Sequence, residues 1–177
     1  MTQNTPRLSP PTPEEIDAAK AQGRYLVTIT MDKGGIIEVV LEGAEMPLTT
    51  ANLVKLIQTG YYNGLTFHRV VPDFVIQGGD PSGNGTGGPG YAIKLEISPK
   101  LKHKKGAISM ARSQSPDSAG SQFFLCLADT PHLDSGYAVF GWTKSGQEVI
   151  DNVKVGDRMK TVTVEPYSGT EADPLVG

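Results

Sequence analysis

Short apolar segments recur along the whole of this 177-residue chain, and glycine, proline or other turn residues separate each segment from the next. In most segments apolar and polar residues alternate, which is typical of β-strands with one buried face. The 21 glycines fit a chain with many tight turns. We therefore predict a mainly β protein in which about eight strands close into an antiparallel β-barrel. The predicted strands lie at residues 25–31, 36–41, 91–97, 107–111, 122–127, 137–142 and 161–164, with two more within 64–80.

Two helices are expected to cover the ends of this barrel. The first extends from Met46 to about Thr59 and stops at Gly60, a residue type that commonly ends helices. The second is opened by Ser145 and Glu148, which have the spacing of a capping box. One helix early and one late in the chain fit a barrel with a helix over each end.

The beginning of the chain differs in composition from the rest. It is polar and rich in proline, and Thr12 with Glu15 forms another capping box at the start of a short helix. That helix has few apolar residues, so we expect it to lie on the surface. We predict that residues 1–23 form a polar N-terminal tail with this short helix. Residues 24–177 form one domain, with a C-terminal tail from about residue 167.

Charge and cysteine content narrow the classes of function. The net charge of −3 gives no electrostatic reason to expect nucleic acid or a membrane surface as a partner. The single cysteine, Cys126, cannot form an internal disulfide, which suits a reducing compartment. The N-terminus lacks the apolar core of a secretion signal, and no apolar run approaches ~18 residues. We expect a cytoplasmic protein, and a monomer because no coiled-coil pattern is present.

Several short motifs imitate sites of other protein classes. Residues 83–88 match G-x-G-x-x-G, but a dinucleotide site needs a helix to begin there, and a predicted strand follows instead. The basic run 100–105 lacks interleaved aromatic residues, which favours a solvated loop. The three histidines have no metal-ligand spacing, and Cys126 lies inside an apolar strand, as a small buried residue does. We predict neither a metal nor a cofactor.

The stretch from Gly64 to Asp80, GLTFHRVVPDFVIQGGD, holds the densest set of candidate site residues. A Pro-Asp turn separates its two predicted strands, so Arg69, Phe74 and Gln77 should lie close together. These side chains provide a cation, an aromatic ring and an amide, but no nucleophile with its base. Such a set is suited to hold a neutral and partly apolar group while donating hydrogen bonds to it.

Four motifs follow one another along the chain: FHRVVPDFVIQGGDPSGNGTGG, GAISMARS, GSQFFLCLADTPHLD and YAVFGW. In this order they resemble the cyclophilin family of peptidyl-prolyl cis-trans isomerases, over residues 24–165. The resemblance implies an eight-stranded antiparallel barrel capped by two helices, in agreement with the strand pattern. It also implies an isomerase (rotamase) that acts in protein folding. Its partners would be proline-containing peptides and unfolded proteins.

The resemblance also assigns roles to individual residues. Arg69 matches the catalytic arginine of the family, Gln77 the glutamine that orients it, and Phe74 a wall of the proline pocket. We predict these three as the catalytic set. The predicted substrate-binding residues are Val75, Ala111, Arg112, Gln122, Phe124, His132, Leu133 and Tyr137.

Four of these positions depart from common residues of the family. Val75 stands where many members have methionine, and Arg112 where asparagine is common. His132 and Tyr137 stand where the best-known eukaryotic members have tryptophan and histidine. The family implies inhibition by cyclosporin. Because His132 lacks the large apolar surface and the donor of an indole, we predict weak inhibition.

The chemistry of X-Pro rotation explains why such a site needs no nucleophile. Rotation faces a barrier of ~18–20 kcal/mol because amide resonance is lost. At the twisted transition state the prolyl nitrogen regains its lone pair, so a donor such as Arg69 binds it best there. No proton is transferred and no covalent intermediate is expected. The alternative is a module that binds proline peptides without turnover, and a peptide exchange assay separates the two.

Overall fold

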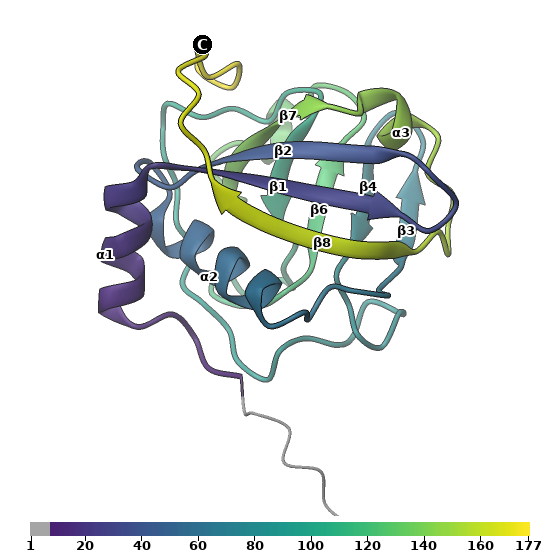
Figure 1. The fold of residues 1–177 in the computed structure, drawn as a ribbon, viewed down its shortest axis with the longest axis horizontal. Helices are drawn as coiled ribbons and strands as arrows, with labels where there is room; N and C mark the ends of the chain where they lie inside the picture. Colours follow the sequence, from purple (N-terminus) through teal and green to yellow (C-terminus); the bar gives the residue numbers. More distant parts are fainter. Residues whose placement is uncertain (1–7) are drawn as a thin grey trace, which may run out of the picture.

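The computed structural model describes residues 8–177, so the part of the predicted tail at residues 1–7 lies outside the described chain. In the described part, eight strands and three α-helices follow one another as Figure 1 shows. The strands are β1 (Arg24–Met31), β2 (Ile36–Glu42), β3 (Phe67–Val71), β4 (Val75–Gly78), β5 (Ala107–Met110), β6 (Phe123–Cys126), β7 (Val139–Ser145) and β8 (Met159–Pro166). The helices are α1 (Pro13–Gln22), α2 (Pro47–Gln58), α3 (Gln147–Asp151) and a 3-10 turn, η1 (Pro131–Leu133).

All eight strands belong to one antiparallel sheet, in the order β3-β4-β6-β5-β7-β2-β1-β8. This confirms the predicted mainly β, eight-stranded antiparallel architecture. The predicted closure is only partial. The starts of the edge strands β3 and β8 meet at an isolated bridge between Thr66 and Arg158, where the amides of Phe67 and Met159 donate to the carbonyls of Asp157 and Leu65. Beyond that bridge β8 pairs with β1 along its length, whereas β3 stops at Val71, and the sheet is a curled half-barrel.

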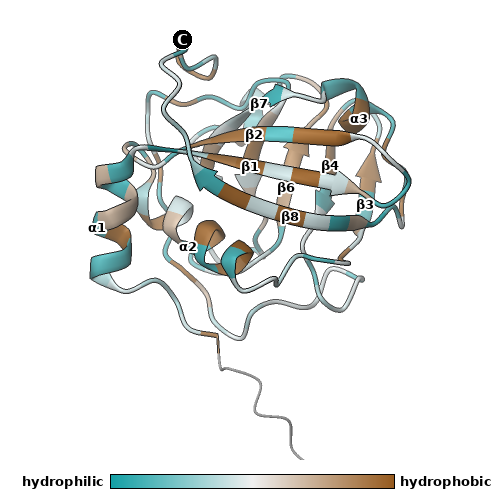
Figure 2. Cartoon of the chain, viewed as in Figure 1, coloured by the Kyte–Doolittle hydropathy of each residue, from teal (hydrophilic) through white to brown (hydrophobic). Residues whose placement is uncertain are grey.

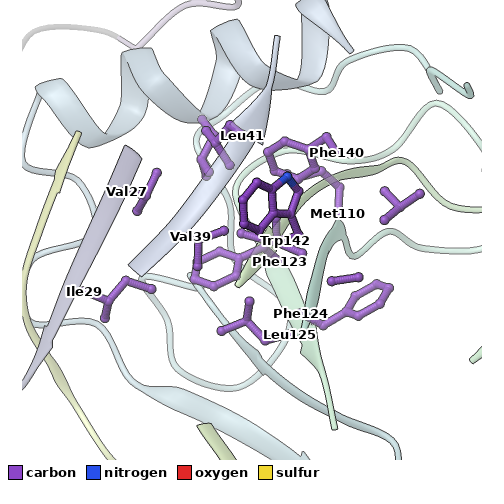
Figure 3. Packing of buried hydrophobic residues seen from close by; sticks show 14 of the residues in the cluster. Val27, Ile29, Val39, Leu41, Met110, Phe123, Phe124, Leu125, Phe140 and Trp142 are labelled. Carbon is purple, nitrogen blue, oxygen red and sulfur yellow. The ribbon is translucent and has the colours of Figure 1, made fainter. Parts of the chain in front are cut away.

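Apolar side chains from all eight strands form one buried core, and Figure 3 labels those of β1, β2, β5, β6 and β7. Phe67, Ile76 and Phe140 have no exposed surface, and Leu41 and Leu125 are equally buried. Figure 2 shows the hydropathy alternating along β1 and β8, as expected for strands with one face toward this core, whereas β2 is apolar over most of its length. Helix α2 packs on β2 and β8, and α3 packs on β2. Within residues 8–177 no helix combines the length and the apolar character needed to cross a bilayer.

Helix α2 confirms the predicted early helix, but a distant residue caps it. The backbone amides of Leu48 and Thr49 donate to the carboxylate of Glu96, at 3.0 and 2.8 Å. These are first-turn amides, which have no partner inside the helix. Glu96 therefore supplies the cap that Met46 cannot supply.

The predicted strand at residues 91–97 is wrong. The segment forms only an isolated bridge between Ile93 and Ala119. The backbone amide of Leu95 donates to the carboxylate of Asp117 at 2.9 Å, and Glu96 caps α2. Because these polar partners draw the segment away from the sheet edge, its apolar residues do not make a strand.

The predicted late helix is present as α3, but its predicted capping box is wrong. Ser145 is the last residue of β7, and its hydroxyl donates to Glu38 at 2.7 Å. The residue before the helix is Gly146, in the left-handed region at φ 91°. A β-carbon on Gly146 would lie 2.3 Å from the carbonyl oxygen of Ile36, so glycine is required there.

Helix α1 begins with the predicted capping box, since Thr12 and Glu15 bond each other's backbone amides. The helix packs on α2, where Glu15 pairs with Lys55 at 2.9 Å. Among its residues Ala19 alone is buried. The helix therefore lies on the surface, as its thin apolar content predicted (Figure 1).

The C-terminal segment after β8 packs against the loop at residues 101–102 and the ends of β1 and β2. Leu175 is buried, and its carbonyl accepts the amide of Lys102 at 3.0 Å. Asp173 hydrogen-bonds the mostly buried carboxyl of Glu42. Burial, and then this contact with Glu42, raises the pKa of Asp173 to about 7.

This carboxyl pair predicts a pH-dependent stability. Unfolded aspartate has a pKa of about 3.9. Between about pH 4 and 7 the folded form therefore keeps a proton that the unfolded form has already released. Stability from Asp173 is therefore full below pH 4 and is lost as pH rises through about 7. Between pH 5 and 8 we expect the parent protein to lose about 1–2 kcal/mol more unfolding free energy than Asp173→Asn, after allowance for solvent screening. Urea unfolding at both pH values measures this, with the exposed Asp17→Asn as control; equal losses in parent and Asp173→Asn would contradict it.

Candidate active site

A hollow of about 180 Å³ lies where β3 and β4 meet the ends of β5 and β6 and the η1 turn. Its walls are apolar at the base and carry two guanidinium groups and an amide. Nine of the eleven predicted site residues line it, and the two others, Gln122 and His132, lie beside it. The lining residues are Arg69, Phe74, Val75, Gln77, Ala111, Arg112, Phe124, Leu133 and Tyr137.

Strand register brings the central three residues together. Arg69 on β3 lies opposite Gln77 on β4, and Gln77 lies opposite Phe124 on β6. Residues directly opposite each other on antiparallel strands point to the same face of the sheet. A cation, an amide and an aromatic ring therefore share one rung across three adjacent strands.

The orientation of Arg69 is set by a row of side-chain hydrogen bonds. One terminal nitrogen of Arg69 donates to the Gln77 amide oxygen at 3.2 Å. The Gln77 amide nitrogen donates to the Gln122 oxygen at 3.0 Å. The Gln122 nitrogen then donates to the carbonyls of Gly85 and Gly87, at 3.0 and 2.9 Å. Each of the two side-chain amides is hydrogen-bonded through both its oxygen and its nitrogen, so neither can rotate by a half-turn. Gln77 therefore presents its oxygen to Arg69.

The glycine loop at the end of this row is built around a buried carboxylate. Asp80 is 1% exposed and accepts the backbone amides of Ser82, Asn84 and Gly85, at 2.7, 3.1 and 2.5 Å. Burial raises the pKa of Asp80, but these amides and that of Gly87 outweigh it, and the pKa is lowered. The amides that a phosphate would need are thus occupied, and no helix follows the loop. This agrees with the rejection of the nucleotide interpretation.

The residues at the apolar base of the hollow are held by a ring contact and by a backbone hydrogen bond. Phe124 is 5% exposed, and its ring meets Tyr137 edge-on at 6.0 Å. Leu133 and Tyr137 are tied by a backbone bond from the Tyr137 amide to the Leu133 carbonyl, at 3.2 Å. Tyr137 therefore belongs to this turn, and β7 begins at Val139 instead of at the predicted residue 137.

His103 packs against the apolar base of the hollow and was not among the residues predicted from the sequence. His103 is buried and stacks on the Phe124 ring at 6.0 Å. Its Nδ1 bonds Asp134 at 2.8 Å and its Nε2 bonds the Ser109 hydroxyl at 2.9 Å. Burial lowers the pKa of His103 more than Asp134 raises it. Ser109 is fully buried, so this trio is a structural support and no substrate reaches it.

The remaining polar candidates lie around the hollow. His132 stacks on Phe74 with ring centres 5.5 Å apart and adds to the rim. His68 is partly buried beside Arg69, and burial lowers its pKa. Cys126 is fully buried, and burial raises the pKa of its thiol to about 11, which confirms the prediction of a small buried residue.

A second hollow of about 380 Å³ adjoins the first. The two share Gln77, Ala111 and Arg112, so these residues form the saddle between them. The far side of the larger hollow is the glycine loop, residues 85–90. The apolar hollow is therefore continuous with the larger one across this saddle.

The fold and the site together define a class of protein: an antiparallel half-barrel with an arginine held over a small apolar pocket. Comparison with known proteins specifies the class further. The model of the family described as "Cyclophilin type peptidyl-prolyl cis-trans isomerase/CLD" matches residues 26–168.

Individual relatives agree with this match. A peptidyl-prolyl cis-trans isomerase of Helicobacter pylori is 49% identical over 139 residues, which are 76% of this chain and 83% of that protein. Peptidyl-prolyl cis-trans isomerase B of Bacillus subtilis is 48% identical over 136 residues, 76% and 94% of the two chains. The crystal structure of a cyclophilin type isomerase of Cryptosporidium parvum has a TM-score of 0.75 at 30% identity, covering 82% of this chain and 99% of that one. The chain belongs to the family of cyclophilin-type peptidyl-prolyl cis-trans isomerases.

Proposed function

We propose that this protein catalyses rotation about X-Pro peptide bonds in flexible or unfolded polypeptides, and that the smaller hollow holds the proline ring. The observation that carries the proposal is the placement of Arg69. Its guanidinium is fixed by Gln77 at the edge of an apolar hollow of about 180 Å³. Family membership supports the same activity.

In the proposed mechanism the apolar pocket and Arg69 have separate roles. Val75, Phe124 and Leu133 are buried apolar side chains that would hold the ring and disfavour the polar planar amide. Arg69 would donate a hydrogen bond to the prolyl nitrogen, whose lone pair is available only in the twisted amide. The second lone pair of the Gln122 side-chain oxygen, together with the backbone beside it, would anchor the residues that flank the proline while the amide rotates. Neither a proton nor a covalent bond is transferred.

A solved structure supports the choice of ligand. The Cryptosporidium parvum isomerase has also been crystallised in the presence of the dipeptide Ala-Pro. That structure has a TM-score of 0.69 and 31% identity, and covers 81% of this chain. We infer that proline-containing peptides and unfolded proteins are the substrates here too, with a cytoplasmic site of action.

The test is NMR exchange spectroscopy on a short X-Pro peptide with the intact protein. Catalysis predicts faster exchange between the cis and trans resonances at substoichiometric protein. Binding shifts without faster exchange would instead identify a proline-peptide module that does not turn over.

The residue at position 132 predicts the response to cyclosporin. The His132 ring is smaller and more polar than an indole, and in the structure it stacks on Phe74. We expect weak inhibition of the parent protein, and about tenfold tighter inhibition of His132→Trp, since an indole adds apolar area and a donor. Inhibition constants for the peptide exchange reaction measure this, with Val155→Trp, an exposed position outside both hollows, as control. An unchanged constant in His132→Trp would contradict it.

A further inference from the structure

The saddle between the two hollows carries a fixed positive charge. Arg112 donates from Nε and one terminal nitrogen to the Gly136 carbonyl, at 2.9 and 2.8 Å. Its other terminal nitrogen donates to the Ser113 and Gln114 carbonyls, at 2.9 and 3.4 Å. The guanidinium also lies over the Tyr137 ring, 4.4 Å from its centre. Four hydrogen bonds and a stacked ring therefore hold the group in place before any ligand binds.

These contacts position the charge but do not neutralise it. The three acceptors, the carbonyls of Gly136, Ser113 and Gln114, are neutral backbone groups. Within residues 8–177, no carboxylate oxygen lies within 4.0 Å of Arg112 or of Arg69. Arg112 thus differs from Arg24, which is held by the carboxylate of Glu42 at 2.9 Å.

No acidic side chain among the described residues lines either hollow, although the whole chain carries a net charge of −3. The nearby carboxylates are engaged elsewhere. Asp80 is buried under the glycine loop, Asp117 accepts the Leu95 amide, and Asp134 bonds His103. The charged groups that a bound peptide meets in the two hollows are Arg69 and Arg112. The site is locally positive on an acidic protein.

We propose that Arg112 makes this isomerase selective for proline peptides with a carboxylate side chain at the residue that lies over the saddle. The inference rests on the proposed isomerase function and names its substrate class. Within residues 8–177, one terminal N–H of the Arg112 guanidinium has no hydrogen-bond partner, and that N–H is the donor available to a peptide carboxylate. A partly exposed pair of this kind is worth about a three- to fivefold preference.

A purely structural role for Arg112 makes a different prediction. If the guanidinium only ties residues 112–114 to the turn at Gly136, its loss lowers the rate for every peptide alike. Charge recognition changes the ratio between peptides that differ only in charge. The ratio is measured within one protein sample, so it is insensitive to how much of a variant is folded.

The experiment compares short proline peptides that carry Glu, Gln or Lys at one of the three positions on either side of the proline. NMR exchange gives kcat/KM for the parent protein, Arg112→Gln, Arg112→Lys and Lys160→Gln. We expect Glu over Gln by about three- to fivefold at one position in the parent protein, with Lys the poorest. That preference should fall toward one at about 0.5 M salt, because screening weakens partly exposed pairs.

In Arg112→Gln the ratio should fall to about one, whereas Arg112→Lys should retain a preference because the charge remains. Lys160→Gln removes a cation from an exposed position on β8 and should leave the ratio unchanged. A Glu to Gln ratio near one at all positions in an active parent protein would overturn the inference. So would a preference that persists in Arg112→Gln. Absence of catalysis with every peptide would instead refute the isomerase function itself.

Discussion

The Arg69→Ala variant is expected to remain folded and to catalyse X-Pro exchange about a hundredfold to a thousandfold more slowly than the parent protein. The side chain is exposed, and among residues 8–177 its one side-chain bond is to Gln77, so little stability depends on it. The activity depends on it because it is the donor placed to meet the prolyl lone pair. That bond forms only in the twisted amide, so its loss falls on kcat.

Exchange spectroscopy on one X-Pro peptide, with melting curves for both proteins, measures this effect. Arg69→Lys keeps the positive charge but loses the planar fork that Gln77 orients, and should recover part of the rate. Lys144→Ala, an exposed cation on β7, is the matched control and should be as active as the parent. Activity that survives Arg69→Ala unchanged would disprove the proposed mechanism, whatever the family of the protein.

The Glu42→Ala variant is expected to lose about 3 kcal/mol of unfolding free energy. The Glu42 carboxylate accepts two bonds from Arg24, at 2.9 and 3.1 Å, and one from the Trp142 indole at 2.9 Å. Burial raises the pKa of Glu42, but its hydrogen bonds from Arg24, Asp173 and Trp142 outweigh burial and lower it. Removing the carboxylate leaves a guanidinium that is 18% exposed and a buried indole N–H without their partner.

The loss of unfolding free energy should lie toward the lower end of the range for buried ion pairs that lose one partner. The reason is that Asp173 remains close enough to Arg24 to place a negative charge near it. Urea unfolding at pH 7 measures it. Glu165→Ala on β8 removes an exposed carboxylate from the same sheet and should change stability by less than about 0.5 kcal/mol. Equal effects of the two substitutions would show that the cluster around Glu42 contributes nothing beyond a surface charge.

Much of the fold follows from local pattern. Alternation identifies β1 and β2 with their connecting turn, and the capping box of Thr12 and Glu15 fixes the start of α1. The segment at residues 91–97 shows the limit of such patterns. Its residues alternate as in a strand, but Glu96 caps helix α2 and the Leu95 amide donates to the carboxylate of Asp117. Ser145 likewise has a capping spacing but bonds Glu38 across the sheet instead.

In the candidate site, too, some contacts follow from local pattern and others depend on pairing between distant segments. Arg69 and Gln77 are eight residues apart on consecutive strands, so a hairpin prediction is enough to bring them together. Phe124 joins their rung only through the pairing of β4 with β6. His103 could not be found at all, because its partners Ser109 and Asp134 reach it from separate segments. No short motif encodes that trio.

Local pattern was enough to predict most of the strands, the early helices and the approach of Arg69 to Gln77, because each rests on contacts within a few positions of the chain. How far the sheet closes and which charges are paired depend on contacts between distant segments. Glu42 meets Arg24 across 18 residues and Trp142 across 100. In the part of the chain that the structure describes, Arg112 bonds neutral carbonyls and no carboxylate. Whether a charge is neutralised or left for a ligand depends on distances of a few ångströms between strands and loops, and only the register of the folded sheet sets those distances.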